Sequence, residues 1–169
     1  MRRAGGSTPI VFAFSGDPVL AKLVDSYARP GGRFTGMSML SLDLTAKRME
    51  LLKELIPNLK RVAILANPAH PGEEAERRAS QASAQPLKLV LEYFPVRDQG
   101  ELEPALARIQ QAHCEAIVVF PDAGTMTYSK RIAAFTAQTG IPAISGWVAF
   151  AESGNLATYG PEFAMPTDG

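Results

Sequence analysis

Short polar residues recur in this chain soon after apolar runs that are typical of β-strands. Hydroxyl, amide and carboxylate groups at such positions suit a zwitterion or a carboxylate ligand, and an indole ring offers a face for stacking. Helix capping would select an aspartate or a threonine there equally well, and a core position would suit the tryptophan equally well. The candidate ligand-binding residues are Ser15, Asp17, Asn67, Asp122, Thr125, Gly146 and Trp147.

The apolar runs have the spacing of a parallel sheet with crossover helices. They begin at Val62, Leu89, Ala116 and Ile141, at intervals of 27, 27 and 25 residues. Helix-like stretches lie between them, which predicts an α/β fold with a mostly parallel sheet flanked by helices. Ligands bind outside the carboxyl ends of the strands in such sheets, so we expect the candidate residues to gather at one edge.

The predicted helices differ in what they can bury. Met49 and Leu52 lie on an apolar stripe, and residues 102–109 repeat the same spacing. The helix at 73–84 has only alanines for its inner face, and we expect Glu73, Glu74, Arg77 and Arg78 to form a solvated charged face. A further helix is predicted over residues 125–138.

The N-terminal part of the chain has too few elements to form a core. Residues 10–14 predict a buried strand, residues 19–28 a helix that begins after Asp17, and residues 34–39 a short extended piece. The strand must therefore add to the sheet of this domain or to that of a partner. The predicted organisation is a remnant of a first lobe and hinge at 1–41, an α/β ligand-binding lobe at 42–160 and a tail at 161–169.

Composition excludes several kinds of partner and site. The 17 basic and 17 acidic residues cancel, so no basic field favours nucleic acid, and no apolar run reaches the roughly 20 residues that span a bilayer. Cys114 is the single cysteine, which rules out an internal disulfide. His70 has no second ligand at metal spacing, and His113 beside Cys114 is expected to be structural. We expect no metal, no cofactor and no nucleic-acid partner.

The sequence lacks the phosphate-binding and nucleophile motifs of common α/β enzymes. It has no G-x-G-x-x-G after a strand, no G-x-x-x-x-G-K-[ST] and no G-x-S-x-G. A Rossmann-like enzyme would need such a phosphate loop or a catalytic pair. We therefore expect a binding protein rather than an enzyme.

An ordered series of short motifs runs from about Pro9 to Phe163. Its members are Gly16-Asp17-Pro18-Val19, Ala28-Arg29-Pro30-Gly31-Gly32, Glu50-Leu51-Leu52-Lys53-Glu54-Leu55-Ile56-Pro57, Asn67-Pro68, Pro121-Asp122, Ile141-Pro142-Ala143-Ile144 and Tyr159-Gly160-Pro161. In this order they resemble the substrate-binding proteins of ABC transporters, in the tryptophan/tyrosine-uptake-like branch of the type I periplasmic fold.

The resemblance implies two α/β lobes that hinge and close on a small ligand. The chain is similar to the second lobe with a strand and helix of the first attached. The implied function is the solute-binding component of an ABC importer, which binds a small molecule such as an amino acid, with an aromatic side chain favoured through Trp147, and meets the transporter permease. The implied location is periplasmic, although we expect no signal peptide in this chain.

Besides the Rossmann-like enzyme considered above, one other reading remains open at this point. An effector-sensing domain of a transcription regulator shares the two-lobed fold but would need a basic helix-turn-helix, and none is visible. A separate expectation concerns association between copies of the chain. If they were exposed, an unpaired strand edge and an apolar surface would result from the run at 10–14 and the stripe at 19–28, and both would favour association. We therefore expect a homodimer through residues 9–40.

Overall fold

The computed structural model describes residues 8–39 and 42–161. Its main sheet has five strands in the order β4-β3-β5-β6-β7, and every neighbouring pair is parallel. The α/β architecture and the parallel pairing of the predicted strands are therefore confirmed. The strands are β3 (Arg61–Ala66), β4 (Val90–Pro95), β5 (Ala116–Val119), β6 (Ala143–Ser145) and β7 (Ala157–Thr158).

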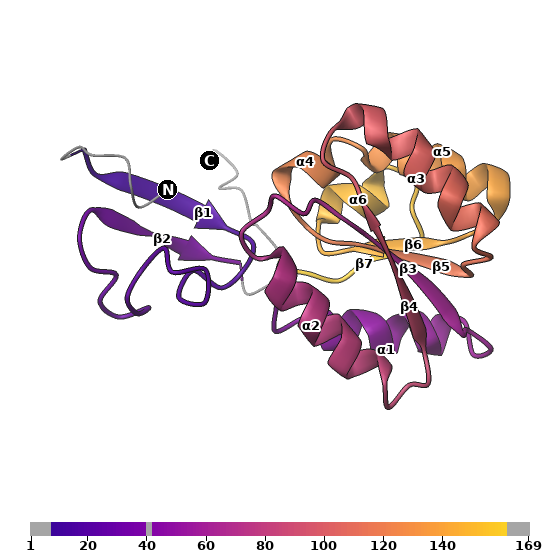
Figure 1. The fold of residues 1–169 in the computed structure, drawn as a ribbon, viewed down its shortest axis with the longest axis horizontal. Helices are drawn as coiled ribbons and strands as arrows, with labels where there is room; N and C mark the ends of the chain where they lie inside the picture. Colours follow the sequence, from indigo (N-terminus) through magenta and orange to yellow (C-terminus); the bar gives the residue numbers. More distant parts are fainter. Residues whose placement is uncertain (1–7, 40–41, 162–169) are drawn as a thin grey trace, which may run out of the picture.

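Helices cover both faces of this sheet (Figure 1). Met49 and Leu52 of α1 pack with Ile64 on one face, which α2 also covers, while Leu102 of α3 and Ile132 of α5 pack on the other. Residues 42–161 are called the large unit below. Its helices are α1 (Thr45–Leu55), α2 (Glu73–Ala84), α3 (Gln99–Gln111), α4 (Ala123–Met126), α5 (Ser129–Thr139) and α6 (Val148–Glu152).

Residues 8–39, called the small unit below, form a separate two-stranded sheet (Figure 1). β1 (Ile10–Phe14) pairs in parallel with β2 (Phe34–Ser38), with Ile10 opposite Phe34. The strand at 10–14 was expected to join the main sheet or a partner. It finds its hydrogen-bond partner instead in the extended piece that was predicted at 34–39.

The helix predicted at 19–28 is wrong, because the structure has a single turn there. Asp17 caps this turn as predicted, with Oδ1 accepting from the amides of Val19 at 2.7 Å and Leu20 at 3.0 Å. Lys22 then adopts a φ of 55°, and Leu23 N–H donates to the carbonyl of Pro18 at 2.9 Å. A left-handed residue with this hydrogen bond is a Schellman-type stop, so a right-handed helix cannot continue.

Two further expectations about helices also change. α2 has the predicted bounds, but Glu73, which was expected in solvent, is buried, as is Glu76. The helix predicted at 125–138 is divided into α4 and α5, because the amides of Thr127 and Tyr128 bond three residues back instead of four. The predicted tail, apart from Pro161, lies outside the described residues.

Candidate functional site

The predicted site edge lies where the order of the main sheet reverses. The chain passes from β3 outward to β4 and then returns to β5 on the other side of β3. Asn67 follows β3 and Asp122 follows β5, so both leave the same end of two adjacent parallel strands. A Cβ atom on Gly124 would lie 3.6 Å from Asn67 Nδ2, which places the two loops side by side. Such a reversal opens a crevice for ligands.

A cavity of about 390 Å³ lies between this edge and the end of β1. Its walls are mainly apolar and include aromatic rings from both units. Of the seven predicted residues, Ser15 and Trp147 line it. The lining residues are Phe12, Ala13, Phe14, Ser15, Leu23, Met39, His70, Pro71, Ala123, Met126 and Trp147.

Asp122 is buried directly before the residues of α4 that line the cavity. Its Oδ1 accepts from the amides of Gly124 at 2.7 Å and Thr125 at 3.3 Å. Its Oδ2 is buried and has no hydrogen-bond partner among the residues that the structure describes. A buried carboxylate oxygen without a donor is costly, so this atom is suited to accept from a bound cationic or N–H group.

Three other predicted residues make contacts that hold the loops of this edge in place. The Thr125 hydroxyl donates to the carbonyl of Phe120 at 2.6 Å and accepts from the amide of Asp122, which completes a capping box. Asn67 Oδ1 accepts from the amide of Ala69 at 3.0 Å. A Cβ on Gly146 would lie 2.8 Å from Arg48 Nη1 and 3.1 Å from Pro121 Cγ, so a larger residue would crowd the buried Arg48 side chain.

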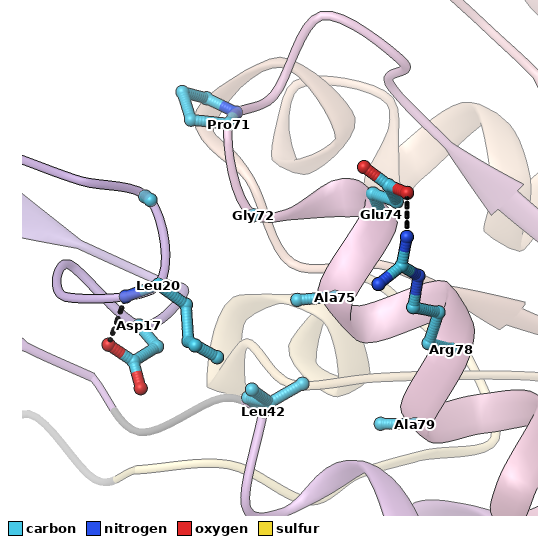
Figure 2. A pocket seen from close by; sticks show the side chains of 10 residues that line it. Asp17, Leu20, Leu42, Pro71, Gly72, Glu74, Ala75, Arg78 and Ala79 are labelled. Carbon is cyan, nitrogen blue, oxygen red and sulfur yellow. Dashed lines mark hydrogen bonds and ion pairs between the residues drawn. The ribbon is translucent and has the colours of Figure 1, made fainter.

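Asp17 lines a different cavity from Ser15. This second cavity has a volume of about 380 Å³ and lies between the capped turn and α2 (Figure 2). Leu20 and Leu42 face Ala75 and Ala79 across it, and the Glu74–Arg78 ion pair lies on the α2 side (Figure 2). The structure therefore separates two candidates that the sequence placed together.

His70, which was not among the predicted ligand-binding residues, lines the first cavity. Its ring stacks on Phe14 with centroids 5.3 Å apart, and its Nε2 lies 2.9 Å from Ser15 Oγ. Phe12 and Phe14, on alternate residues of β1, were also missed. Their period-2 spacing and the position of His70 in an edge loop were the available signals.

A buried ion pair lies between α1 and α2. Arg48 Nη2 is 2.9 Å from Glu76 Oε1 and 3.2 Å from Thr45 Oγ1, and the arginine side chain is fully buried. Arg48 Nη1 also reaches the carbonyl of Tyr159 at 3.5 Å. Burial raises the pKa of Glu76 to about 7, against the opposing pull of the Arg48 guanidinium. The pair thus ties α1 and α2 to the segment that leaves β7.

The described residues contain no group of three or more His, Cys, Asp or Glu side chains that could hold a metal ion. Burial raises the pKa of Cys114 to about 11, so this thiol stays protonated at neutral pH and is a poor nucleophile. In the ranges 8–39 and 42–161, no helix combines the length and the apolar character needed to cross a bilayer.

Comparison with known proteins gives matches over most of the chain. Residues 1–165 match the family described as ABC transporter substrate binding protein. A "Tyrosine-binding protein" of Clostridioides difficile (strain R20291) is 42% identical over 60 residues, which are 35% of this chain and 16% of that protein.

Two solved structures are similar over nearly the whole chain. One, of an ABC domain in complex with L-Trp from Streptococcus pneumonia, is 25% identical with a TM-score of 0.83, over 93% of this chain and 52% of that one. The other, of a conserved domain protein from Vibrio cholerae, is 26% identical with a TM-score of 0.81, over 90% and 51%. The chain thus spans about half the length of these relatives. With its parallel α/β fold and its family match over residues 1–165, the chain belongs to the ABC transporter substrate-binding protein family.

Proposed function

We propose that this chain is part of the solute-binding component of an ABC importer and that its solute is an amino acid, with an aromatic side chain favoured. The family membership supports a solute-binding role. The relatives described as tyrosine-binding and as bound to L-Trp support the solute class. The small unit would then belong to the first lobe and the large unit would be the second.

The observation that carries this proposal is the pairing of aromatic walls with an unsatisfied buried carboxylate oxygen. Phe12, Phe14 and Trp147 line the cavity and can surround an apolar side chain. Asp122 does not line it but directly precedes the lining residue Ala123, and its buried Oδ2 would accept from an ammonium group once ligand binding opens access to it. Ser15 lines the same cavity and can donate its hydroxyl hydrogen to a carboxylate. An aromatic amino acid presents all three kinds of group.

The proposed partners and location follow from the same family. They are a transporter permease and a periplasmic or extracellular setting. The proposal of a second copy of the chain through residues 9–40 has a different basis, the exposed apolar side chains of that segment. No turnover is proposed, so a bound amino acid should be recovered chemically unchanged. Hydrolysis or redox chemistry that disappears in Asp122→Ala would favour an enzyme instead. None of the comparisons supports the transcription-regulator alternative.

Calorimetry with two matched ligands tests the proposal. L-Tryptophan should bind with a dissociation constant of about 1 μM or tighter, and indole-3-propionate, which lacks the ammonium group, should bind much more weakly. Asp122→Asn should weaken L-tryptophan binding about 10- to 150-fold, the worth of a hydrogen bond to a charged group, and should change indole-3-propionate binding little.

Asp98→Asn is the matched control. Asp98 caps α3 with the same two amide contacts that Asp122 makes at α4, but it does so at an exposed site away from the cavity. Its replacement should leave both affinities unchanged. Equal losses for the two ligands in Asp122→Asn would show that the carboxylate supports the loop and does not bind an amine.

A further inference from the structure

The two units touch each other at the end of β1 and the loop after β3. Ser15 Oγ lies 2.9 Å from His70 Nε2, and Phe14 stacks on the same imidazole with an interplanar angle of 20°. Behind this contact, Cβ atoms on Gly16 or Gly72 would each lie 3.2 Å from the other glycine's Cα. His70 therefore occupies a tight junction between the small unit and the large unit.

The second ring nitrogen of His70 fixes its tautomer. Gly72 N–H donates to Nδ1 at 3.2 Å, so Nδ1 carries a lone pair and no hydrogen. In the neutral ring the hydrogen must then be on Nε2, which donates to Ser15 Oγ. Because the serine oxygen accepts this hydrogen bond, its own O–H is free to turn toward another acceptor in the cavity.

We propose that His70 is a positioning residue of the solute site: its neutral, Nε2-protonated imidazole holds the Ser15 hydroxyl and fixes the end of β1 against the large unit. The assignment rests on the proposed solute-binding function for its effect on affinity. The junction and the tautomer stand independently of any ligand. Through Phe14 and Ser15, His70 sets both an apolar wall and a hydrogen-bond donor of the cavity.

The hydrogen bond from Gly72 to Nδ1 requires a neutral ring, which makes this arrangement sensitive to pH. A proton on Nδ1 would face the Gly72 N–H donor and would break that hydrogen bond. Burial lowers the pKa of His70, and it outweighs the opposing pull of Asp122 before α4 and of Glu73 at the start of α2. Because the pKa of His70 is lowered, the junction between the two units is favoured above the ordinary histidine pKa of about 6.5. This stabilisation is lost as the pH falls below that value.

Three variants separate the two hydrogen bonds. Asn in place of His70 can keep an acceptor near Nδ1 but loses the donor to Ser15, whereas Gln can keep a donor near Nε2 but loses the acceptor for Gly72. Ser15→Ala removes the partner hydroxyl. At pH 8, His70→Asn and Ser15→Ala should each weaken L-tryptophan binding about two- to tenfold, and combining them should add little.

The pH profile gives a readout that a purely structural role would not move. Between pH 8 and 5.5 the dissociation constant of the unaltered chain should rise, by at most about tenfold per pH unit, because one proton is taken up. His70→Asn and His70→Gln should both remove this rise. His113→Asn, at an exposed histidine whose φ of 53° asparagine tolerates, should keep it.

Nitrogen NMR of the ligand-free protein completes the test. His70 should show the Nε2–H tautomer and a pKa below the ordinary histidine value of about 6.5. An Nδ1–H tautomer, or a dissociation constant that does not change with pH in the unaltered chain, would overturn the role of His70. Failure of L-tryptophan to bind at all, with the tautomer as stated, would instead overturn the proposed solute class.

Discussion

The small and large units differ in how much apolar surface they bury within themselves. Both apolar core clusters lie in the large unit, where α1 and α2 cover one face of the main sheet and α3, α5 and α6 cover the other. Between residues 8 and 39, the buried aliphatic and aromatic side chains that the structure describes are Phe14, Pro18 and Val24. The large unit therefore carries its own hydrophobic stabilisation, at about 25 cal/mol for each Å² of apolar surface buried.

The stability of the small unit depends on its contacts with other surfaces. Val11 is 79% exposed and Leu20 61% exposed, and a two-stranded sheet alone is at best marginally stable in water. Its contacts with the large unit through Phe14 and Ser15 hold it against the cavity. The comparison shows that the chain contains a large unit with its own hydrophobic core and a small unit whose stability depends on contacts with a neighbouring surface.

The largest expected effect is at the buried ion pair of the large unit. Glu76→Ala should lower the free energy of unfolding by about 3–5 kcal/mol, because Arg48 would be left as a buried charge without its carboxylate. Denaturant unfolding followed by circular dichroism measures this change. Glu74→Ala, two residues away on α2, removes an exposed ion pair with Arg78 and should cost about 0.5 kcal/mol or less.

The double variant Arg48→Met/Glu76→Leu sharpens this result. If the cost of Glu76→Ala comes from the uncompensated charge, replacing both partners by apolar side chains should recover most of the lost stability. A double variant as unstable as the single one would show instead that the pair is needed for the packing of α1 against α2.

Matched leucines compare the two units directly. Leu102→Ala in α3 removes a side chain that is 0% exposed and should cost about 2–5 kcal/mol, through lost burial and a residual cavity. Leu20→Ala in the small unit should cost about 0.5 kcal/mol or less, because that side chain lies mostly in solvent. Equal losses of unfolding free energy for the two variants, in thermal or denaturant unfolding, would contradict the division into a self-sufficient large unit and a dependent small unit.

The smallest change in folding stability, but a visible change in mass, is expected for Val11→Asp. The exposed apolar side chains of β1 and β2 include Val11 and Met37, and the proposed homodimer would cover them. Light scattering should give twice the monomer mass for the unaltered chain and the monomer mass for Val11→Asp. A chain that stays monomeric over a wide concentration range would count against the dimer. Val90→Asp on β4 is a control at a similarly exposed valine of the large unit.

The sequence predicts the large unit better than the small one for a physical reason. Repeated apolar runs with helical stripes between them determine parallel pairing, because each strand must be buried on both faces. The turn at 17–23 could not be predicted in this way. Lys22 ends the turn in a left-handed conformation that usually belongs to glycine, so its residue type gives no signal for this stop.

The candidate site was predictable as an edge but not as a set of contacts. Asn67 and Asp122 meet because parallel strands end together. The Arg48–Glu76 pair joins two different helices, and the Ser15–His70 pair joins two different units, so neither has a local pattern. The role of Thr125 as a capping residue was one of the readings that the sequence left open, and its buried hydrogen bonds support that reading.

The order of strands in the main sheet also has a kinetic consequence. β3 and β5 are neighbours, with Val62 opposite Ala116, and α2, β4 and α3 lie in the connection between them. This long connection must close before β3 can pair with β5. The entropy cost of closure therefore precedes the stabilising contacts between the two strands. As the chain emerges from the ribosome, the pairing of β3 with β4 can form early, whereas the loops that carry Asn67 and Asp122 come together only after β5 has been made.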